Sequence, residues 1–292
     1  MHEALLYEKL EDKNVRCNLC NHRCFISDNR RGICGVRENK NGTLYSLVYG
    51  KIIAEHIDPI EKKPLYRFLP NTFSLSVATV GCNFKCLHCQ NADISQFTKE
   101  KAKADIIGEE KTPQEIVRDA IKNKCPSISY TYTEPTIFME FALDCMKPAK
   151  DKGLKNVWVS NGYMTKKALD LIDPFLDAIN VDLKAFTKDF YRDVCGAKLQ
   201  PVLDNLIDIK KRKIHLEITT LIIPGKNDSE YELKEIAEFI KKELGSDTPW
   251  HVSRFFPHFR MPDVPSTPVE KVYRAAEIGK EAGLKYVYAG NV

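Results

Sequence analysis

From about residue 72 to the end of the chain, apolar β-branched runs alternate with charged stretches of helical periodicity. The stretches that predict helices include residues 112–122, 135–151, 166–175, 230–244 and 268–282, and several have Thr, Ser or Pro near their start. The apolar runs predict strands at residues 73–80, 127–133, 156–160, 178–183, 215–223, 250–255 and 286–288. This order predicts an α/β fold, a partial or near-complete parallel (β/α) barrel, because repeated strand–helix units build a parallel sheet covered by helices.

The chain changes character near residue 72. Before it, short turn-rich pieces carry four cysteines and lack the strand–helix rhythm. The sequence therefore predicts a small cysteine-rich N-terminal metal-binding region at residues 1–71 and the barrel at residues 72–292. In such a barrel, the groups that perform chemistry lie at the carboxyl ends of the strands.

Charge and hydropathy exclude several classes of protein. Among 292 residues, 44 Lys and Arg stand against 40 Asp and Glu, and these charges are dispersed, which gives no support to nucleic-acid binding. No apolar run approaches the ~18 residues of a membrane span, and the charged start of the chain has no apolar signal segment. We therefore expect a cytoplasmic protein with no membrane span.

A cysteine motif follows the first predicted strand. Cys82, Cys86 and Cys89 form a C-x3-C-x2-C loop, and three thiolates suit a 4Fe-4S cluster whose fourth iron stays open to another molecule. The alternative is a zinc site completed by His88 or by a distant ligand, because closed zinc sites take four ligands.

A second cysteine group lies near the N-terminus. Cys17, Cys20, Cys24 and Cys34 supply four thiolates, enough to close a tetrahedral site. Zinc and an auxiliary iron–sulfur cluster both fit; spacing does not choose between them, and complete coordination slightly favours zinc. A disulfide pair is less suited to a reducing cytoplasm. The isolated Cys125, Cys145 and Cys195 are expected to be buried apolar residues.

Polar residues end the predicted strands. Glu134 stands between the second strand and a helix, where it is either a ligand-binding group or a carboxylate that complements the helix dipole. Asp182 and Lys184 share one face of the fourth strand end, as a cofactor contact or as a buried ion pair. His251 in the sixth strand shares a face with Ser253 and is a further pocket candidate, although a lone histidine is more often a core or surface residue.

The loop Gly81-Cys82-Asn83-Phe84-Lys85-Cys86-Leu87-His88-Cys89 resembles the radical S-adenosylmethionine (SAM) superfamily. The segments around Cys17-Asn18-Leu19-Cys20, Gly32-Ile33-Cys34-Gly35 and Asp58-Pro59-Ile60-Glu61 narrow this likeness. With them, nearly the whole chain is similar to radical SAM proteins of the AmmeMemoRadiSam system, relatives of pyruvate formate-lyase activating enzymes.

The resemblance implies where SAM binds. SAM would chelate the open iron, and Glu134 would contact its amino group, although Tyr132 and Thr133 stand where the family commonly has two glycines. It also implies that His88 lies against the adenine. The remaining candidates for SAM contacts come from the ends of later strands: Ser160, Asn161, Asp182, Lys184 and His251.

The resemblance also implies an activity. A radical SAM oxidoreductase would take an electron from a donor such as flavodoxin or ferredoxin, cleave SAM and abstract hydrogen from a substrate that the sequence does not identify. Activation of a glycyl-radical enzyme competes here with modification of a small molecule, a lipid or another partner protein. An alternative to an enzyme is an iron–sulfur electron carrier or a metal-stabilised binding module without SAM chemistry.

Overall fold

An eight-stranded sheet forms the centre of the computed structural model, which describes residues 1–100 and 105–292. Its strand order is β16-β15-β14-β13-β12-β11-β9-β8, and every neighbouring pair is parallel except β8 and β9. The strands are β8 (Ala54–Pro59), β9 (Phe73–Ala78), β11 (Ser127–Tyr130), β12 (Lys155–Ser160), β13 (Ala178–Asp182), β14 (His215–Ile222), β15 (Trp250–Arg254) and β16 (Val287–Gly290). The predicted α/β class with a parallel, barrel-like sheet is confirmed.

All seven predicted strands are present, with their ends shifted by a few residues. β11 stops at Tyr130 rather than at residue 133, because the chain turns sharply at Tyr132, whose φ is 62°. The antiparallel edge strand β8 lacks a clear apolar signal and is not among the predicted strands. β8 belongs to the large sheet although it precedes residue 72. The domain boundary at residue 72 stays a prediction.

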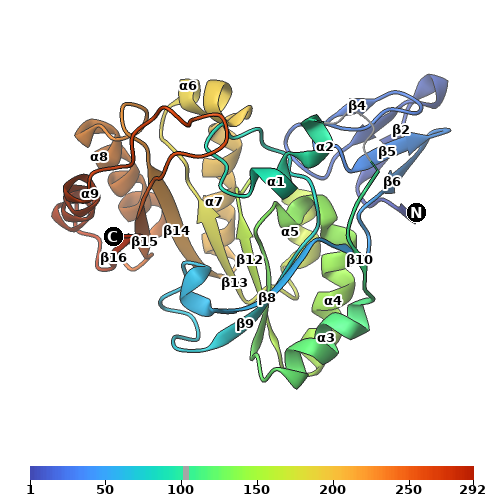
Figure 1. Ribbon diagram of the computed structural model, residues 1–292, viewed down its shortest axis with the longest axis horizontal. Helices are drawn as coiled ribbons and strands as arrows, with labels where there is room; N and C mark the ends of the chain where they lie inside the picture. The colour runs from blue at the N-terminus through green and yellow to red at the C-terminus, as the bar shows by residue number, and fades with distance from the viewer. Residues whose placement is uncertain (101–104) are drawn as a thin grey trace.

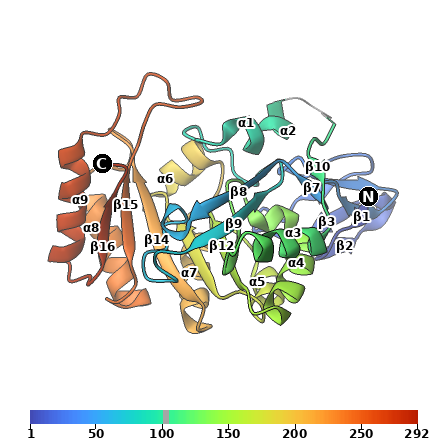
Figure 2. The ribbon, with the colours of Figure 1, turned by 60° about the horizontal axis from the view of Figure 1, so that its bottom comes forward.

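Helices pack along the sheet. The described helices are α1 (Ala92–Ser95), α2 (Phe97–Glu100), α3 (Pro113–Lys122), α4 (Met139–Asp151), α5 (Lys166–Ile172), α6 (Lys188–Phe190), α7 (Gln200–Lys211), α8 (Glu230–Phe239) and α9 (Val269–Glu281). α3 contacts β9 and β11, α4 contacts β12, α7 contacts β14, and α9 contacts β15 and β16. Figures 1 and 2 show α8 and α9 beside β16, and α3 and α4 towards the β9 side of the sheet.

Local sequence explains the helix ends. Thr112 caps α3 in a reciprocal capping box with Glu115, and Thr165 and Ser229 cap α5 and α8. Short non-α turns extend the elements: η1 (Glu11–Lys13), η2 (Ile60–Lys62), η3 (Pro135–Phe138), η4 (Tyr191–Cys195) and η5 (Ile240–Leu244). The first predicted helical stretch after β11 thus begins with the 3-10 turn η3, and the one at residues 230–244 ends in the π-helical turn η5.

Small antiparallel sheets make up the N-terminal region. β1 (His2–Glu3), β6 (Thr43–Ser46) and β5 (Arg37–Lys40) form one, and β2 (Tyr7–Lys9), β3 (Val15–Cys17) and β4 (Phe25–Ile26) form another. β7 (Lys51–Ile52) pairs with β10 (Glu109–Glu110). Figure 1 shows these sheets at the side of the molecule opposite the C-terminus, beside α2.

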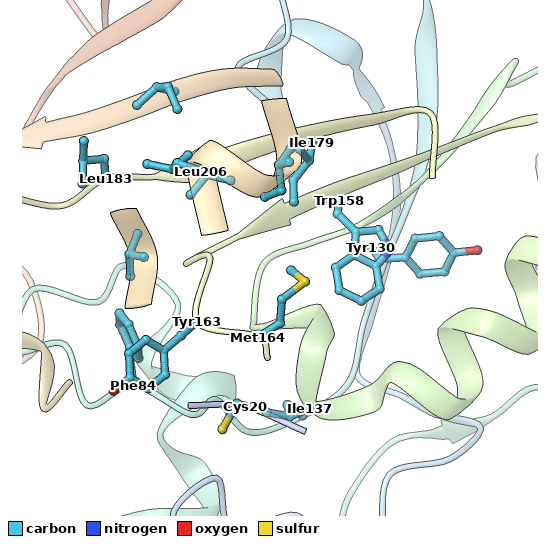
Figure 3. Packing of buried hydrophobic residues seen from close by; sticks show 14 of the residues in the cluster. Cys20, Phe84, Tyr130, Ile137, Trp158, Tyr163, Met164, Ile179, Leu183 and Leu206 are labelled. Atoms are coloured by element: carbon cyan, nitrogen blue, oxygen red, sulfur yellow. The ribbon is translucent and has the colours of Figure 1, made fainter. Parts of the chain in front are cut away.

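One hydrophobic core runs from the large sheet into the N-terminal region (Figure 3). Trp158 and Tyr130 fill it within the sheet, while Phe84 and Tyr163 pack edge to face with ring centroids 5.2 Å apart. Cys20 belongs to the same core and forms a β-bridge with Met164. Within the described residues, no helix is both long enough and apolar enough to cross a membrane.

Candidate active site

A cavity of about 630 Å³ opens at the carboxyl ends of the parallel strands. Seven sequence-predicted residues of the loop and strand ends line it together: Cys82, Cys86, Cys89, His88, Glu134, Ser160 and Asn161. Asp182, Lys184, His251 and Ser253 line the same cavity from β13, the residues after it and β15. The fold thus brings together every site residue predicted from the central part of the sequence, as expected for a parallel α/β sheet.

The cysteine loop is anchored by backbone contacts. Gly81, at φ 98°, starts the loop, and a Cβ there would lie 2.6 Å from Val36 Cγ1, so only glycine fits. Lys85 N donates to Cys195 O at 2.8 Å, and Leu87 N donates to Val194 O at 3.0 Å. These bonds hold the loop against the segment that follows α6.

Burial shapes the chemistry of the three thiols. It raises the pKa of Cys82 and of Cys89, while a hydrogen bond with the Cys195 thiol, followed by burial, raises the pKa of Cys86. Cys195 is fully buried as expected, but it is not isolated, because it lies beside Cys86. Such thiols lose their protons when a metal binds and offsets the charge.

The carboxylate of Glu134 is buried in a cradle of donors. Ser160 Oγ donates to Oε1 at 2.9 Å, and Asn161 N donates to Oε2 at 2.8 Å. Thr136 adds its hydroxyl at 2.5 Å and its N–H at 3.1 Å, which makes Glu134 the cap of η3 as well as a cavity residue. Burial still raises the pKa of this carboxyl, with the hydrogen bonds opposing the rise, so a ligand cation would stabilise its ionised form.

Asp182 and Lys184 form an ion pair, with Nζ 2.9 Å from Oδ2. Burial opposes the charge of Lys184, but the attraction of Asp182 and nearby thiols outweighs it and leaves the pKa of Lys184 well above its ordinary value.

His88 in the cysteine loop is buried beside this ion pair. Burial, reinforced by the Lys184 charge, lowers the pKa of His88 to about 3, and its Nδ1 has no hydrogen-bond partner among the described residues.

His251 joins a buried network that the sequence analysis missed. Its Nε2 donates to Glu217 Oε2 at 2.6 Å, and His215 Nε2 donates to Oε1 at 2.9 Å. Glu217 also accepts from the N–H groups of Tyr66 and Arg67, at 3.1 and 2.8 Å. Glu217 therefore orients His251 and fastens the segment after η2 to the cavity wall. The sequence does carry a hint of this network, since Glu217 lies among apolar residues of a strand and a buried carboxylate needs hydrogen-bond partners.

A second missed cluster forms the wall near β8. Asp58 Oδ2 accepts from Lys63 Nζ at 2.7 Å and from the Tyr132 hydroxyl, and Lys63 Nζ lies 4.5 Å from the centroid of the Tyr132 ring. Burial favours the neutral acid, but the bonds from Lys63 and Tyr132 outweigh it and hold the pKa of Asp58 well below its usual range. Tyr132, one of the two residues that stand where the family commonly has glycines, thus takes part in this cluster through its ring and its hydroxyl.

A family model decides what kind of protein this cavity belongs to. The model of the radical SAM superfamily matches residues 76–240, more than half of the chain, and includes the cysteine loop. The chain belongs to the radical SAM superfamily. This radical SAM protein is an enzyme of that type, and the superfamily uses a 4Fe-4S cluster and SAM, so both cofactor predictions are confirmed.

Similar proteins include a named activating enzyme. An uncharacterized protein of Methanocaldococcus jannaschii is 49% identical over 292 residues, covering 100% of this chain and 86% of that protein. The pyruvate formate-lyase-activating enzyme of Clostridium pasteurianum is 22% identical over 167 residues, covering 55% of this chain and 66% of that enzyme. The predicted relationship to activating enzymes is confirmed.

The solved structures agree on the fold. A radical SAM methyltransferase from Sphaerobacter thermophilus matches with a TM-score of 0.57 and 16% identity, covering 76% of this chain and 67% of that one. At this identity the likeness concerns the fold alone.

The residues of this radical SAM protein fit the family's cofactors. Three soft thiol donors face one cavity, as an iron–sulfur cluster requires. Among the described residues, no three His, Cys, Asp or Glu side chains are spaced to hold a single metal ion. The loop is compatible with a four-iron cluster, in which each thiolate binds a different iron.

Acid titration should report on Glu217. Its hydrogen bonds with His215 and His251 outweigh burial and lower its pKa to about 2. A lowered folded-state pKa contributes stability above the unfolded value of about 4.5, and this is lost as pH falls towards 2. We expect the metal-free protein to lose about 3 kcal/mol of unfolding free energy over this interval through Glu217 alone.

Urea unfolding across that pH interval measures the loss. Glu217→Gln should flatten the dependence, whereas Glu243→Gln, at an exposed site, should leave it unchanged. An equally steep dependence in Glu217→Gln would show that other groups cause it.

Proposed function

We propose that this chain reductively cleaves SAM and uses the product to abstract hydrogen from a substrate. When bound, a 4Fe-4S cluster supplies the electron that splits SAM into methionine and a 5′-deoxyadenosyl radical. The observation that carries the proposal is that Cys82, Cys86 and Cys89 share one cavity with the buried Glu134 and with the ion pair of Asp182 and Lys184.

Each residue has a role in this proposal. The three cysteines would hold the cluster and leave one iron to SAM. Glu134, held by Ser160 and Asn161, would accept a hydrogen bond from the SAM amino group. Two further sets complete the pocket: Asp182 and Lys184 for the charged ends of SAM, and His88 and His251 for its adenosyl part.

Two hydrogen-bonded clusters support the walls of the cavity. Asp58, Lys63, Glu217 and His251 are buried and hydrogen-bonded, so their clusters would present a fixed surface around SAM. A fixed, enclosed surface excludes water and limits side reactions of a radical.

We infer the partners from the same chemistry. The electron would come from a donor such as flavodoxin or ferredoxin, in the cytoplasm, where cysteines stay reduced. The named activating-enzyme relative supports a partner protein as the substrate class, and a glycyl-radical enzyme is the specific candidate.

The test of the proposal is SAM cleavage under reduction. After anaerobic reconstitution with iron and sulfide, the protein should convert SAM to 5′-deoxyadenosine when dithionite is added, as measured by liquid chromatography. An iron–sulfur electron carrier would bind no SAM and yield no 5′-deoxyadenosine. That result would overturn the proposal.

Glu134→Gln should weaken SAM binding by about 10–100-fold, since a hydrogen bond to a charged group contributes about 1.5–3 kcal/mol. The neutral amide keeps the shape of the side chain but removes the charge that faces the SAM ammonium group. Equilibrium dialysis of SAM on the reconstituted protein measures the effect, with Glu243→Gln as the matched exposed control. Unchanged binding in Glu134→Gln would reduce Glu134 to a helix cap.

A further inference from the structure

A lysine without a role in the proposed function lies against the cysteine loop. Lys99, in α2, is partly buried, and its Nζ donates to the carbonyl oxygen of Phe84, midway along the chain between Cys82 and Cys86. The same Nζ donates to Gln96 Oε1 at 3.2 Å, and Gln96 Nε2 itself donates to Phe84 O at 3.3 Å. The charged end of Lys99 is thus fixed on the loop rather than extended into solvent.

Thiols supply the negative charge that faces this ammonium group. Burial lowers the pKa of Lys99, and the groups that oppose this effect are the thiols of Cys82, Cys34 and Cys86 rather than a carboxylate. A largely desolvated cation without a carboxylate partner is costly unless other negative charge stands nearby. Burial in turn raises the pKa of Cys82, and the charge of Lys99 opposes that rise more than any other group does. Lys99 and the cysteine loop therefore stabilise each other in their charged forms.

Lys99 differs from Lys184 in its position. Lys184 lines the SAM cavity and pairs with Asp182, whereas Lys99 does not line that cavity. The chain just before Lys99 also contacts the loop, because Gly81 N donates to Ile94 O at 3.0 Å. Lys99 thus reaches the loop from outside the cavity, where its charge acts on a bound cluster without contact to SAM.

We propose that Lys99 raises the reduction potential of the cluster held by Cys82, Cys86 and Cys89. Reduction transfers one electron from the flavodoxin or ferredoxin donor and adds one negative charge to the cluster. A fixed nearby cation stabilises that reduced state more than the oxidised state, so the cluster becomes easier to reduce. The inference rests on the proposed function for the presence of the cluster, and Lys99 acts on that cluster rather than on SAM.

The midpoint potential of the reconstituted cluster tests this role. In a redox titration followed by electron paramagnetic resonance without SAM, Lys99→Met should lower the midpoint potential by at least about 59 mV, a tenfold loss in the equilibrium constant for one-electron reduction. Methionine keeps an unbranched side chain and removes the charge. An unchanged midpoint potential in Lys99→Met would overturn the proposal.

Lys85→Met is the matched control. Lys85 belongs to the same loop but is exposed, so water screens its charge and the same substitution should shift the potential much less. Equal shifts in Lys85→Met and Lys99→Met would also overturn the proposal, because the effect would then belong to the total charge of the loop.

Two further variants separate charge from packing. Lys99→Arg keeps the cation and should retain the wild-type potential. Lys99→Gln keeps a donor for Phe84 O without the charge and should lower the potential as Lys99→Met does. Iron and sulfide counts show whether each variant holds the cluster. Loss of the cluster in both neutral variants would overturn the proposal, since Lys99 would then hold the loop rather than set the potential.

The outcome is distinct from that for the proposed function. The resonance signal belongs to the loop cluster if it is absent in Cys82→Ala/Cys86→Ala/Cys89→Ala, which separates it from any cluster at the N-terminal cysteines. A wild-type chain without this signal would overturn the proposed function itself. A reducible loop cluster with equal potentials in the wild type and Lys99→Met would overturn the role of Lys99 alone.

Discussion

Cys86→Ala should lower the rate of 5′-deoxyadenosine formation by more than about 100-fold, since even loss of an outer-shell partner of a metal typically costs about 10–100-fold. Cys86 is the middle cysteine of the loop and, like Cys82 and Cys89, lines the cavity. Its loss leaves two thiolates, too few to hold the cluster while keeping one iron for SAM. The assay is anaerobic SAM cleavage with dithionite, together with iron and sulfide counts.

Two controls make this result specific. Cys145→Ala removes another fully buried cysteine, in α4, that does not line the cavity, and it should keep cleavage near the wild-type rate. Cys195 lies beside Cys86 and could replace it as a ligand, so Cys86→Ala/Cys195→Ala should remove any residual activity. Undiminished cleavage in that double variant would contradict the assignment of the cysteine loop.

The second large effect concerns stability. Arg37→Ala should lower the free energy of unfolding by about 3–5 kcal/mol, the usual cost of leaving one partner of a buried ion pair alone. Arg37 and Glu140 are each almost fully buried, and Arg37 also donates to Leu5 O at 2.7 Å while Glu140 accepts from Leu5 N at 2.7 Å. The pair thus ties the N-terminal segment and β5 to α4.

Urea unfolding of the metal-free protein measures this loss without any contribution from metal binding. Arg118→Ala is the matched control, because Arg118 is 66% exposed in its surface ion pairs and should cost no more than about 1 kcal/mol. Equal costs for the two variants would mean that the buried pair adds nothing to the fold.

Much of the active site could be predicted from local sequence. Cys82, Cys86 and Cys89 are close together along the chain, and their spacing favours an iron–sulfur cluster over a zinc site. Glu134 and Asp182 could be placed as well, because parallel strands bring their carboxyl ends to the same edge of a sheet. The cavity contains each of them.

Other features depend on contacts between distant segments. Glu217 and His251 are 34 residues apart, and Glu140 and Arg37 are 103 residues apart. No local periodicity shows which strand or helix supplies the partner of a buried charge. Cys195 likewise looked isolated in the sequence, and only the folded chain places it beside Cys86.

Local sequence was enough to predict the parallel α/β class, the loop of three cysteines and the polar residues at the strand ends. These follow from hydrophobic periodicity and residue spacing, which are local properties of the chain. The folded chain alone shows that Glu217 orients His251, that the Tyr132 ring covers Lys63, and that the segment of Cys34 packs against the start of the cysteine loop at Gly81. These depend on which side chains meet when the core closes, and burial forces each charged group to meet a partner.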